Sequence, residues 1–159
     1  DRDAVSQVIR SAFGKEGHVR FVGRVRTEVD VCLSLVAETS GVLVGHIIGA
    51  TLPLTIDHRT VRAAYLACVA VTPNLHKQGV GSQLICEMLK QLREQGYEAC
   101  VVLGHPTYYP RFGFDCALAK KIKAPFRGQA FMALELVRGA LDGTSGVAEY
   151  HSLYTEDDE

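Results

Sequence analysis

The segment VAVTPNLHKQGVGS, residues 69–82, decides the fold. It leads from an apolar run through a proline bend into Gly79–Gly81, and Ser82–Gln95 then shows the periodicity of an amphipathic helix. Gly96 is placed as the C-terminal cap of that helix. Glycines let a backbone turn sharply and approach a ligand closely, and helix N-termini attract anions. The segment predicts a strand-to-helix turn that either binds a phosphate group or only closes a tight connection.

Two common nucleotide-binding motifs differ from this segment. A P-loop needs a lysine before its serine or threonine, whereas Gly81 precedes Ser82. A Rossmann fingerprint needs a third small residue where Leu84 stands. The glycine turn also lies in the middle of the chain instead of opening a domain.

The sequence before the glycine turn predicts an antiparallel meander that follows two helices. The helices are expected from Val5 to Ala12, with Gly14 as a stop, and from about residue 18 to 28. Gly45 and Gly49 interrupt the longest strand and indicate a bulge or a close backbone approach. Three apolar stretches joined by short turns read as strands: Cys32–Glu38, Val42–Leu54 and Thr60–Val71.

The sequence after the turn predicts a parallel crossover. Ala99–Leu103 reads as a short strand buried on both faces, which makes it parallel to Thr60–Val71 in a βαβ unit. A loop rich in Gly, Pro and Tyr follows, then a last strand over Phe131–Leu136 and an acidic tail over Glu156–Glu159. We expect a single domain over residues 1–159. Because a helix starts at once and residue 1 is not Met, we also expect a first strand upstream of it.

Composition narrows the classes of function. The chain has 17 Lys and Arg against 18 Asp and Glu, which gives no global field for nucleic acid or an anionic membrane. The local run Lys120, Lys121 and Lys123 is typical of a solvated face. The five cysteines include no CxxC and indicate reduced thiols in a cytoplasmic protein, without a disulfide frame or a zinc site. No apolar run approaches the ~20 residues that span a bilayer.

Two stretches carry a resemblance to a known family. Residues 69–81 resemble the coenzyme A signature of GNAT acetyltransferases, which is an apolar strand, a proline bend and [QR]xxGx[GA] opening a helix; His76 stands where the family has Gln or Arg. Tyr109–Phe114 is similar to the family's YxxxGF element. The two elements follow in the family's order, and the stretches 102–114 and 130–136 look closest to its YhbS-type branch. The resemblance covers nearly the whole chain.

The resemblance implies an α/β (α+β) fold: a mixed central sheet with an antiparallel meander, a parallel crossover and helices on both faces. It implies acetyl-CoA as cosubstrate, no metal, and direct attack of an amine acceptor in a ternary complex. The family's parallel strands splay apart around the pantetheine arm, which would pair with the backbone of Val69 and Val71. The pyrophosphate would lie against the backbone N–H groups of Lys77, Gln78, Gly79, Val80, Gly81 and Ser82.

The resemblance also assigns Tyr109 to the thioester sulfur. Tyrosine titrates near ~10 and an alkyl thiol near ~8.5, so full proton transfer to the departing thiolate is uphill by about 2 kcal/mol. We favour a hydrogen bond that strengthens as charge builds on sulfur. The alternative is that Tyr109 only packs against the cofactor.

The general base and the acceptor stay open. Many relatives carry a Glu on the strand before the glycine turn, but Tyr65–Val71 holds no carboxylate. His105 is the better histidine candidate and His46 the other, while a water chain or a neutral acceptor is equally possible. An acyl intermediate on Cys68 is not favoured. A non-catalytic acetyl-CoA sensor, a longer acyl group and a homodimer are open alternatives, and the acceptor class is open among small amines, antibiotics, amino acids and protein N-termini.

Overall fold

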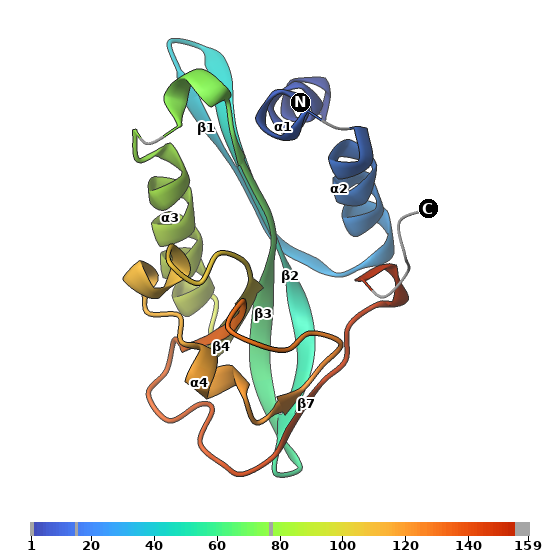
Figure 1. Cartoon of the computed structure of the whole chain (residues 1–159), viewed down its shortest axis with the longest axis vertical. Coiled ribbons are helices and arrows are strands. Elements are labelled where there is room, and N and C mark those ends of the chain that lie inside the picture. Colours follow the sequence, from blue (N-terminus) through green and yellow to red (C-terminus); the bar gives the residue numbers. More distant parts are fainter. Residues whose placement is uncertain (1, 15, 77, 155–159) are drawn as a thin grey trace. The chain divides into compact units, whose positions relative to one another are not determined.

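The computed structural model describes residues 2–14, 16–76 and 78–154 (Figure 1). The chain forms two compact units. Unit 1 holds the described residues up to Ala50 and those of Leu66–Gln91, and unit 2 holds Thr51–Tyr65 and the described residues from Leu92 onward. Strands β2 (Val42–Ile56) and β3 (Arg59–Val71) and helix α3 (Val80–Glu94) contribute to both units.

Unit 1 begins with the two predicted helices, α1 (Arg2–Phe13) and α2 (Glu16–Glu28). Val5, Val8 and Ile9 recur at helical spacing and are buried, which gives α1 one apolar face. Gly14 ends the helix with φ of 67°, and its N–H donates to the Arg10 carbonyl, as expected for a glycine stop.

Strand β1 (Val31–Thr39) pairs antiparallel with β2 and confirms the start of the meander. The register between β1 and β2 shifts twice, opposite the stretches that contain Gly45 and Gly49. The irregularity that these glycines predicted in β2 is therefore confirmed. A Cβ at position 45 would lie 3.0 Å from Leu84 and 3.1 Å from Val80. Glycine at position 45 therefore lets the start of α3 approach β2 closely.

The helices of unit 1 cover opposite faces of its strands. Gly45 faces α3, whereas the next residue, His46, contacts Arg26 of α2. Successive strand residues point to opposite faces, so α2 and α3 lie on different sides, and Figure 1 shows α3 on one side of β1 and β2 with α1 and α2 on the other. Helices on both faces were predicted and are confirmed.

Unit 2 contains a six-stranded part of the sheet in the order β5-β7-β2-β3-β4-β6. Strand β4 (Ala99–Leu103) runs parallel to β3, with Ala63 opposite Ala99 and Tyr65 opposite Val101, which confirms the crossover. Strand β6 (Phe131–Glu135) is antiparallel to β4. The mixed sheet follows the prediction in its central strands.

The β2–β3 hairpin is closed by Asp57 and His58, which have φ of 48° and 66°. Two successive left-handed residues make a type I′ turn, whose twist matches antiparallel strands. The Asp57 carboxylate accepts three hydrogen bonds, from the Thr144 N–H, the Ser145 N–H and the Thr144 hydroxyl. The turn therefore holds a distant loop of unit 2 in place.

The stretch from Gly104 to Ala130 was predicted as a loop, and the structure adds elements to it. It contains α4 (Cys116–Ala119) and β5 (Ile122–Lys123), and β5 pairs with a further strand, β7 (Gly146–Ala148), which lies along β2. Short 3₁₀ turns occupy Pro73–Leu75, Tyr109–Phe112 and Ser152–Tyr154. In the part of the chain that the structure describes, no helix is long and apolar enough to cross a membrane.

Candidate active site

The turn between β3 and α3 in unit 1 presents bare backbone at a helix start. Gly79 has φ of 85°, and a Cβ built there would meet nothing within 4 Å. At the start of the helix, the Gln83 N–H donates a backbone hydrogen bond of 2.9 Å to the Gly79 carbonyl. N–H groups of an opening helical turn lack intrahelical acceptors. An anionic group at this turn therefore stays a prediction, and the open backbone is compatible with it.

His76 ties this turn to the end of β3. Its Nε2 lies 2.7 Å from the Val71 carbonyl oxygen, so Nε2 carries the proton and donates it. The side chain itself is exposed. His76 therefore supplies a side-chain hydrogen-bond donor at the position where the family pattern has Gln or Arg.

The predicted pantetheine-binding residues lie on β3. Val69 and Val71 are half-buried and alternate with the buried Cys68 and Ala70. Next in the chain, the Thr72 Oγ1 is buried without a hydrogen-bond partner among the described residues. Gln78, Gly79, Val80, Gly81 and Ser82 follow in the turn and the first residues of α3, and the predicted contact at Lys77 lies outside the described residues.

Burial removes Cys68 as a nucleophile. Its side chain is buried, and desolvation raises the pKa of the thiol to about 11. A thiol with that pKa stays protonated near neutral pH, and the thiolate is the nucleophilic form. An acyl intermediate on Cys68 is therefore disfavoured.

Tyr109 of unit 2 is held in a turn built by the backbone of His105. The His105 carbonyl accepts from the N–H groups of Tyr108 at 3.1 Å and Tyr109 at 3.3 Å. The Tyr109 ring is buried against Gly104, where a Cβ would lie only 2.3 Å from the ring. The Phe114 ring meets it edge-on at 5.8 Å. The ring position is therefore fixed by neighbours on two sides.

The two histidine candidates differ in their surroundings. The His105 side chain is exposed on this turn. His46 in unit 1 is completely buried, and its Nε2 lies 2.8 Å from Arg26 Nη2 and 3.2 Å from the Ser34 hydroxyl. Burial first, and then the Arg26 charge, lower the His46 pKa to about 4. A base of that strength is protonated in about one molecule in a thousand at pH 7, so His46 is a poor proton acceptor.

A tyrosine cluster in unit 2 was not predicted from the sequence. The hydroxyls of Tyr65 and Tyr154 lie 2.5 Å apart, and Tyr150 packs against both rings. Burial raises the pKa of Tyr150 and of Tyr154 far above neutral pH, so both stay protonated. The spacing of Tyr150 and Tyr154 was the one available signal, but nothing in the sequence connects it with Tyr65.

Comparisons with known proteins identify the family of the chain. The model of the acetyltransferase (GNAT) domain matches residues 1–117. The chain is 31% identical over 157 residues to the N-acetyltransferase YhbS of Escherichia coli K12, covering 97% of this chain and 93% of that protein.

Two solved structures extend the likeness to three dimensions. E. coli YhbS in complex with CoA matches with a TM-score of 0.85 and 30% identity, over 98% of this chain and 87% of that one. A GNAT acetyltransferase from Brucella melitensis in complex with acetyl-CoA matches with a TM-score of 0.74 and 32% identity, over 97% and 92%. Fold, family model and identity along almost the whole chain agree, and the chain therefore belongs to the GNAT family of N-acetyltransferases.

Proposed function

We propose that residues 1–159 act as one domain that transfers the acetyl group of acetyl-CoA to an amine. The observation that carries this proposal is the β3–α3 turn, where a left-handed glycine leaves open space beside a helix N-terminus. Two relatives at 30% identity or more hold CoA or acetyl-CoA in their crystal structures, which supports the same ligand here.

In this proposal the coenzyme A phosphates bind the backbone from Lys77 to Ser82, and the pantetheine pairs with Val69 and Val71. The His76 bond to the Val71 carbonyl is compatible with that pairing, because a carbonyl oxygen has two lone pairs. The half-buried state of both valines leaves this stretch of β3 partly accessible to a ligand.

In the proposed reaction the amine nitrogen attacks the thioester carbon and the carbon–sulfur bond breaks. The sulfur leaves with the bonding electron pair, and the Tyr109 hydroxyl donates a hydrogen bond to it as negative charge builds. The amine gives up its proton to water, because Tyr65–Val71 holds no carboxylate and His46 is a weak base. The pH dependence of kcat/KM tests whether the His105 side chain accepts this proton.

A turnover screen separates this proposal from its alternative. Release of free CoA is followed with small amines, amino acids and a peptide N-terminus as acceptors, and acetyl-CoA binding is measured by calorimetry. We expect binding and amine-dependent release of CoA. Binding without turnover would favour a sensing module, which the missing strand carboxylate also favours, and absence of binding would reject both readings.

A further inference from the structure

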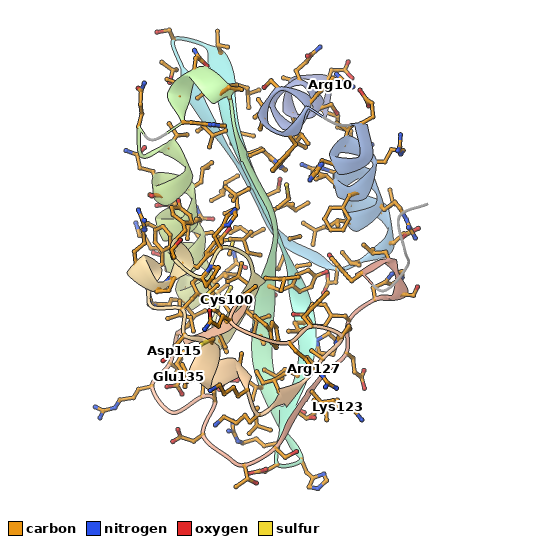
Figure 2. The ribbon with its side chains drawn as sticks, viewed as in Figure 1. Arg10, Cys100, Asp115, Lys123, Arg127 and Glu135 are labelled. Atoms are coloured by element: carbon orange, nitrogen blue, oxygen red, sulfur yellow. The ribbon has the colours of Figure 1, made fainter. Side chains whose placement is uncertain are left out.

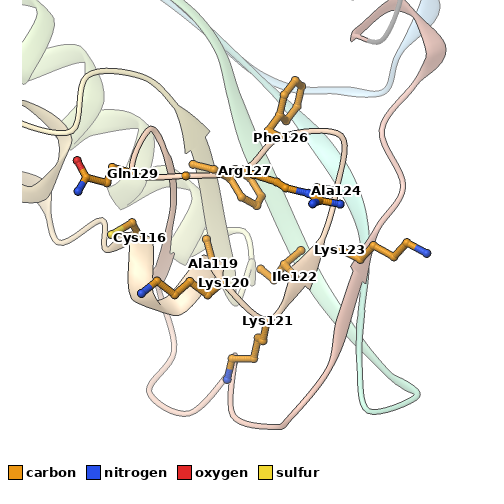
Figure 3. Close-up of a pocket in the computed structure, with 12 residues that line it drawn as sticks. Cys116, Ala119, Lys120, Lys121, Ile122, Lys123, Ala124, Phe126, Arg127 and Gln129 are labelled. Atoms are coloured by element: carbon orange, nitrogen blue, oxygen red, sulfur yellow. The ribbon is translucent and has the colours of Figure 1, made fainter.

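The segment between Phe114 and Phe131 surrounds a hollow in unit 2 (Figure 3). Its volume is about 540 Å³, within the range of pockets that hold small molecules. Helix α4, strand β5 and the loop that follows them line it. None of these elements has a role in the reaction proposed above.

The inner part of the hollow is apolar. Ala119, Ile122 and Phe131 line it with buried side chains. Phe126 forms a further part of the wall and is held by ring contacts with Phe131 at 6.2 Å and with Tyr150 at 5.0 Å. An apolar group of a ligand would be desolvated there.

The rim of the hollow is cationic. Four of the lining residues carry positive charge and none is acidic: Lys120, Lys121, Lys123 and Arg127. Lys121 already donates from Nζ to the carbonyls of Leu141 and Gly143. The other three are exposed and form no ion pair with any described carboxylate. The lysine run that the sequence suggested as a solvated face therefore borders a ligand-sized space.

Two acidic side chains of unit 2 lie away from Lys123 and Arg127 (Figure 2). In Figure 2, Asp115 and Glu135 lie on one side of this unit and Lys123 and Arg127 on the other. The Asp115 carboxylate accepts from the Ala117 N–H, and Glu135 accepts from the Leu141 N–H. Figure 3 shows Lys120 and Lys123 on opposite sides of the hollow, with the Arg127 side chain near Ala124. Because the described residues give Lys120, Lys123 and Arg127 no ion pair, these three cations can pair with an external anion.

The hollow is linked to the turn that carries Tyr109 by one backbone hydrogen bond and by a second hollow. The Gly104 N–H donates to the Ala130 carbonyl at 2.9 Å, and Ala130 precedes the wall residue Phe131. A second hollow of about 420 Å³ shares Cys116 and Gln129 with the first and reaches Pro106 and Pro110 of that turn.

We propose that this hollow binds the acceptor, and that the acceptor is an amine that also carries an acidic group and an apolar side chain. The apolar part would lie on Ile122 and Phe131, and the acidic group would pair with the rim cations. The planar guanidinium of Arg127 suits a carboxylate. The inference rests on the acetyltransferase function proposed above, and it names the substrate class for it.

The first test measures binding alone, with the full chain and three probes. 3-Phenylpropionate, phenyl phosphate and the neutral 3-phenylpropionamide are titrated in turn. We expect one of the two anions to bind at least about tenfold more tightly than the amide, with the stronger anion identifying the acidic group. Arg127→Glu and Lys120→Glu should each remove that preference. Lys90→Glu makes the same charge change at an exposed site on α3. This control variant should still bind the anion more tightly than the amide.

Equal binding of the anions and the amide, or an equal loss with Lys90→Glu, would overturn the inference. The second test compares L-phenylalanine with L-phenylalaninamide as acceptors at equal concentrations of free amine. We expect kcat/KM to favour the amino acid about tenfold, and Arg127→Glu to abolish this.

Acetyl-CoA titration on the same variants separates the two proposals. The inference is supported if Arg127→Glu binds acetyl-CoA normally but no longer prefers the anion over the amide or the amino acid over its amide. Failure of the unchanged protein to bind acetyl-CoA rejects the acetyltransferase function, whether or not the anions bind. Anions that bind while the amino acid has no advantage over its amide would show that the hollow is not the acceptor site.

Discussion

At the scale of single residues, the packing of the Tyr109 ring depends on Gly104 having no side chain. The Tyr109 ring occupies the space that any side chain at position 104 would need, since a Cβ would lie 2.3 Å from it. The residue that fixes the proposed hydrogen-bond donor is therefore a glycine, with no functional group of its own.

Replacing either residue should slow the reaction. We expect Tyr109→Phe to lower kcat roughly 10- to 1000-fold, the range for a positioned donor, with little change in acetyl-CoA affinity. Gly104→Ala should lower kcat to a similar degree, because the ring must move away from its place. Steady-state kinetics and calorimetry measure both quantities, and thermal melts check that each variant is folded.

The double variant decides whether Gly104 acts through the Tyr109 hydroxyl. If it does, adding Gly104→Ala to Tyr109→Phe should cost no further activity. Independent losses that multiply would instead mean that Gly104 shapes something else in the site.

His105 calls for a separate experiment, because the structure shows its carbonyl shaping the Tyr109 turn. With no dedicated base, kcat/KM for a simple alkylamine should rise with pH toward the amine's own value near ~10. We expect His105→Ala to leave this profile unaltered. A plateau near the ordinary imidazole value of about 6.5 that disappears in His105→Ala would identify the histidine as the base.

At the scale of elements, the start of α3 carries the expected phosphate contact. Gly81 is the second residue of the helix, where a valine side chain would crowd the bound pyrophosphate. We expect Gly81→Val to weaken acetyl-CoA binding at least tenfold, or about 1.4 kcal/mol. Gly23→Val places the same side chain in open space on α2 and should leave the titration unchanged. If both variants bound acetyl-CoA with equal affinity, the pyrophosphate would not bind at this turn.

The link between the turn and β3 can be tested through His76. His76→Ala loses the donor to the Val71 carbonyl, and one such bond corresponds to roughly two- to tenfold in affinity. His76→Gln supplies another donor and should restore most of the binding, with kcat near the original value in both. A glutamine variant as weak as the alanine variant would argue against the bond.

The elements that the sequence predicted are those whose pattern is local. α1, α3 and β1 to β4 appear within a few residues of their expected bounds, because each has its own apolar periodicity. β5 and β7 were missed, since strands of two and three residues exist only through pairing with distant segments. The glycine turn and the Tyr109 turn were readable as motifs. The burial of His46 and the cationic hollow depend on segments that only folding brings together.

At the scale of the molecule, the Asp57 carboxylate connects two stretches that are 87 positions apart. Its pKa is lowered by the N–H groups of Thr144 and then Ser145, followed by the Thr144 hydroxyl. A carboxyl with a lower pKa in the folded state stabilises the fold above its unfolded value near ~3.9, and this contribution is lost as pH falls through the folded pKa.

Asp57→Asn should therefore lower Tm at pH 7, and the difference from the unchanged protein should shrink as the pH falls below about 4. Asparagine tolerates the left-handed backbone at this position, so the change tests the charge. Asp142→Asn, in the same loop region, is the control. Thermal melts across the pH range measure the effect, and a difference that stays constant with pH would contradict it.

The pairing of β7 with Leu54–Ile56 of β2 also has a consequence for the order of assembly. On the ribosome, β2 emerges long before Gly146–Ala148 has been made. Until then its edge presents unpaired backbone groups, which is the kind of surface that recruits other chains. We therefore expect a chain truncated before Gly146 to aggregate more readily than the full chain, because the backbone groups of Leu54–Ile56 that pair with β7 would stay exposed.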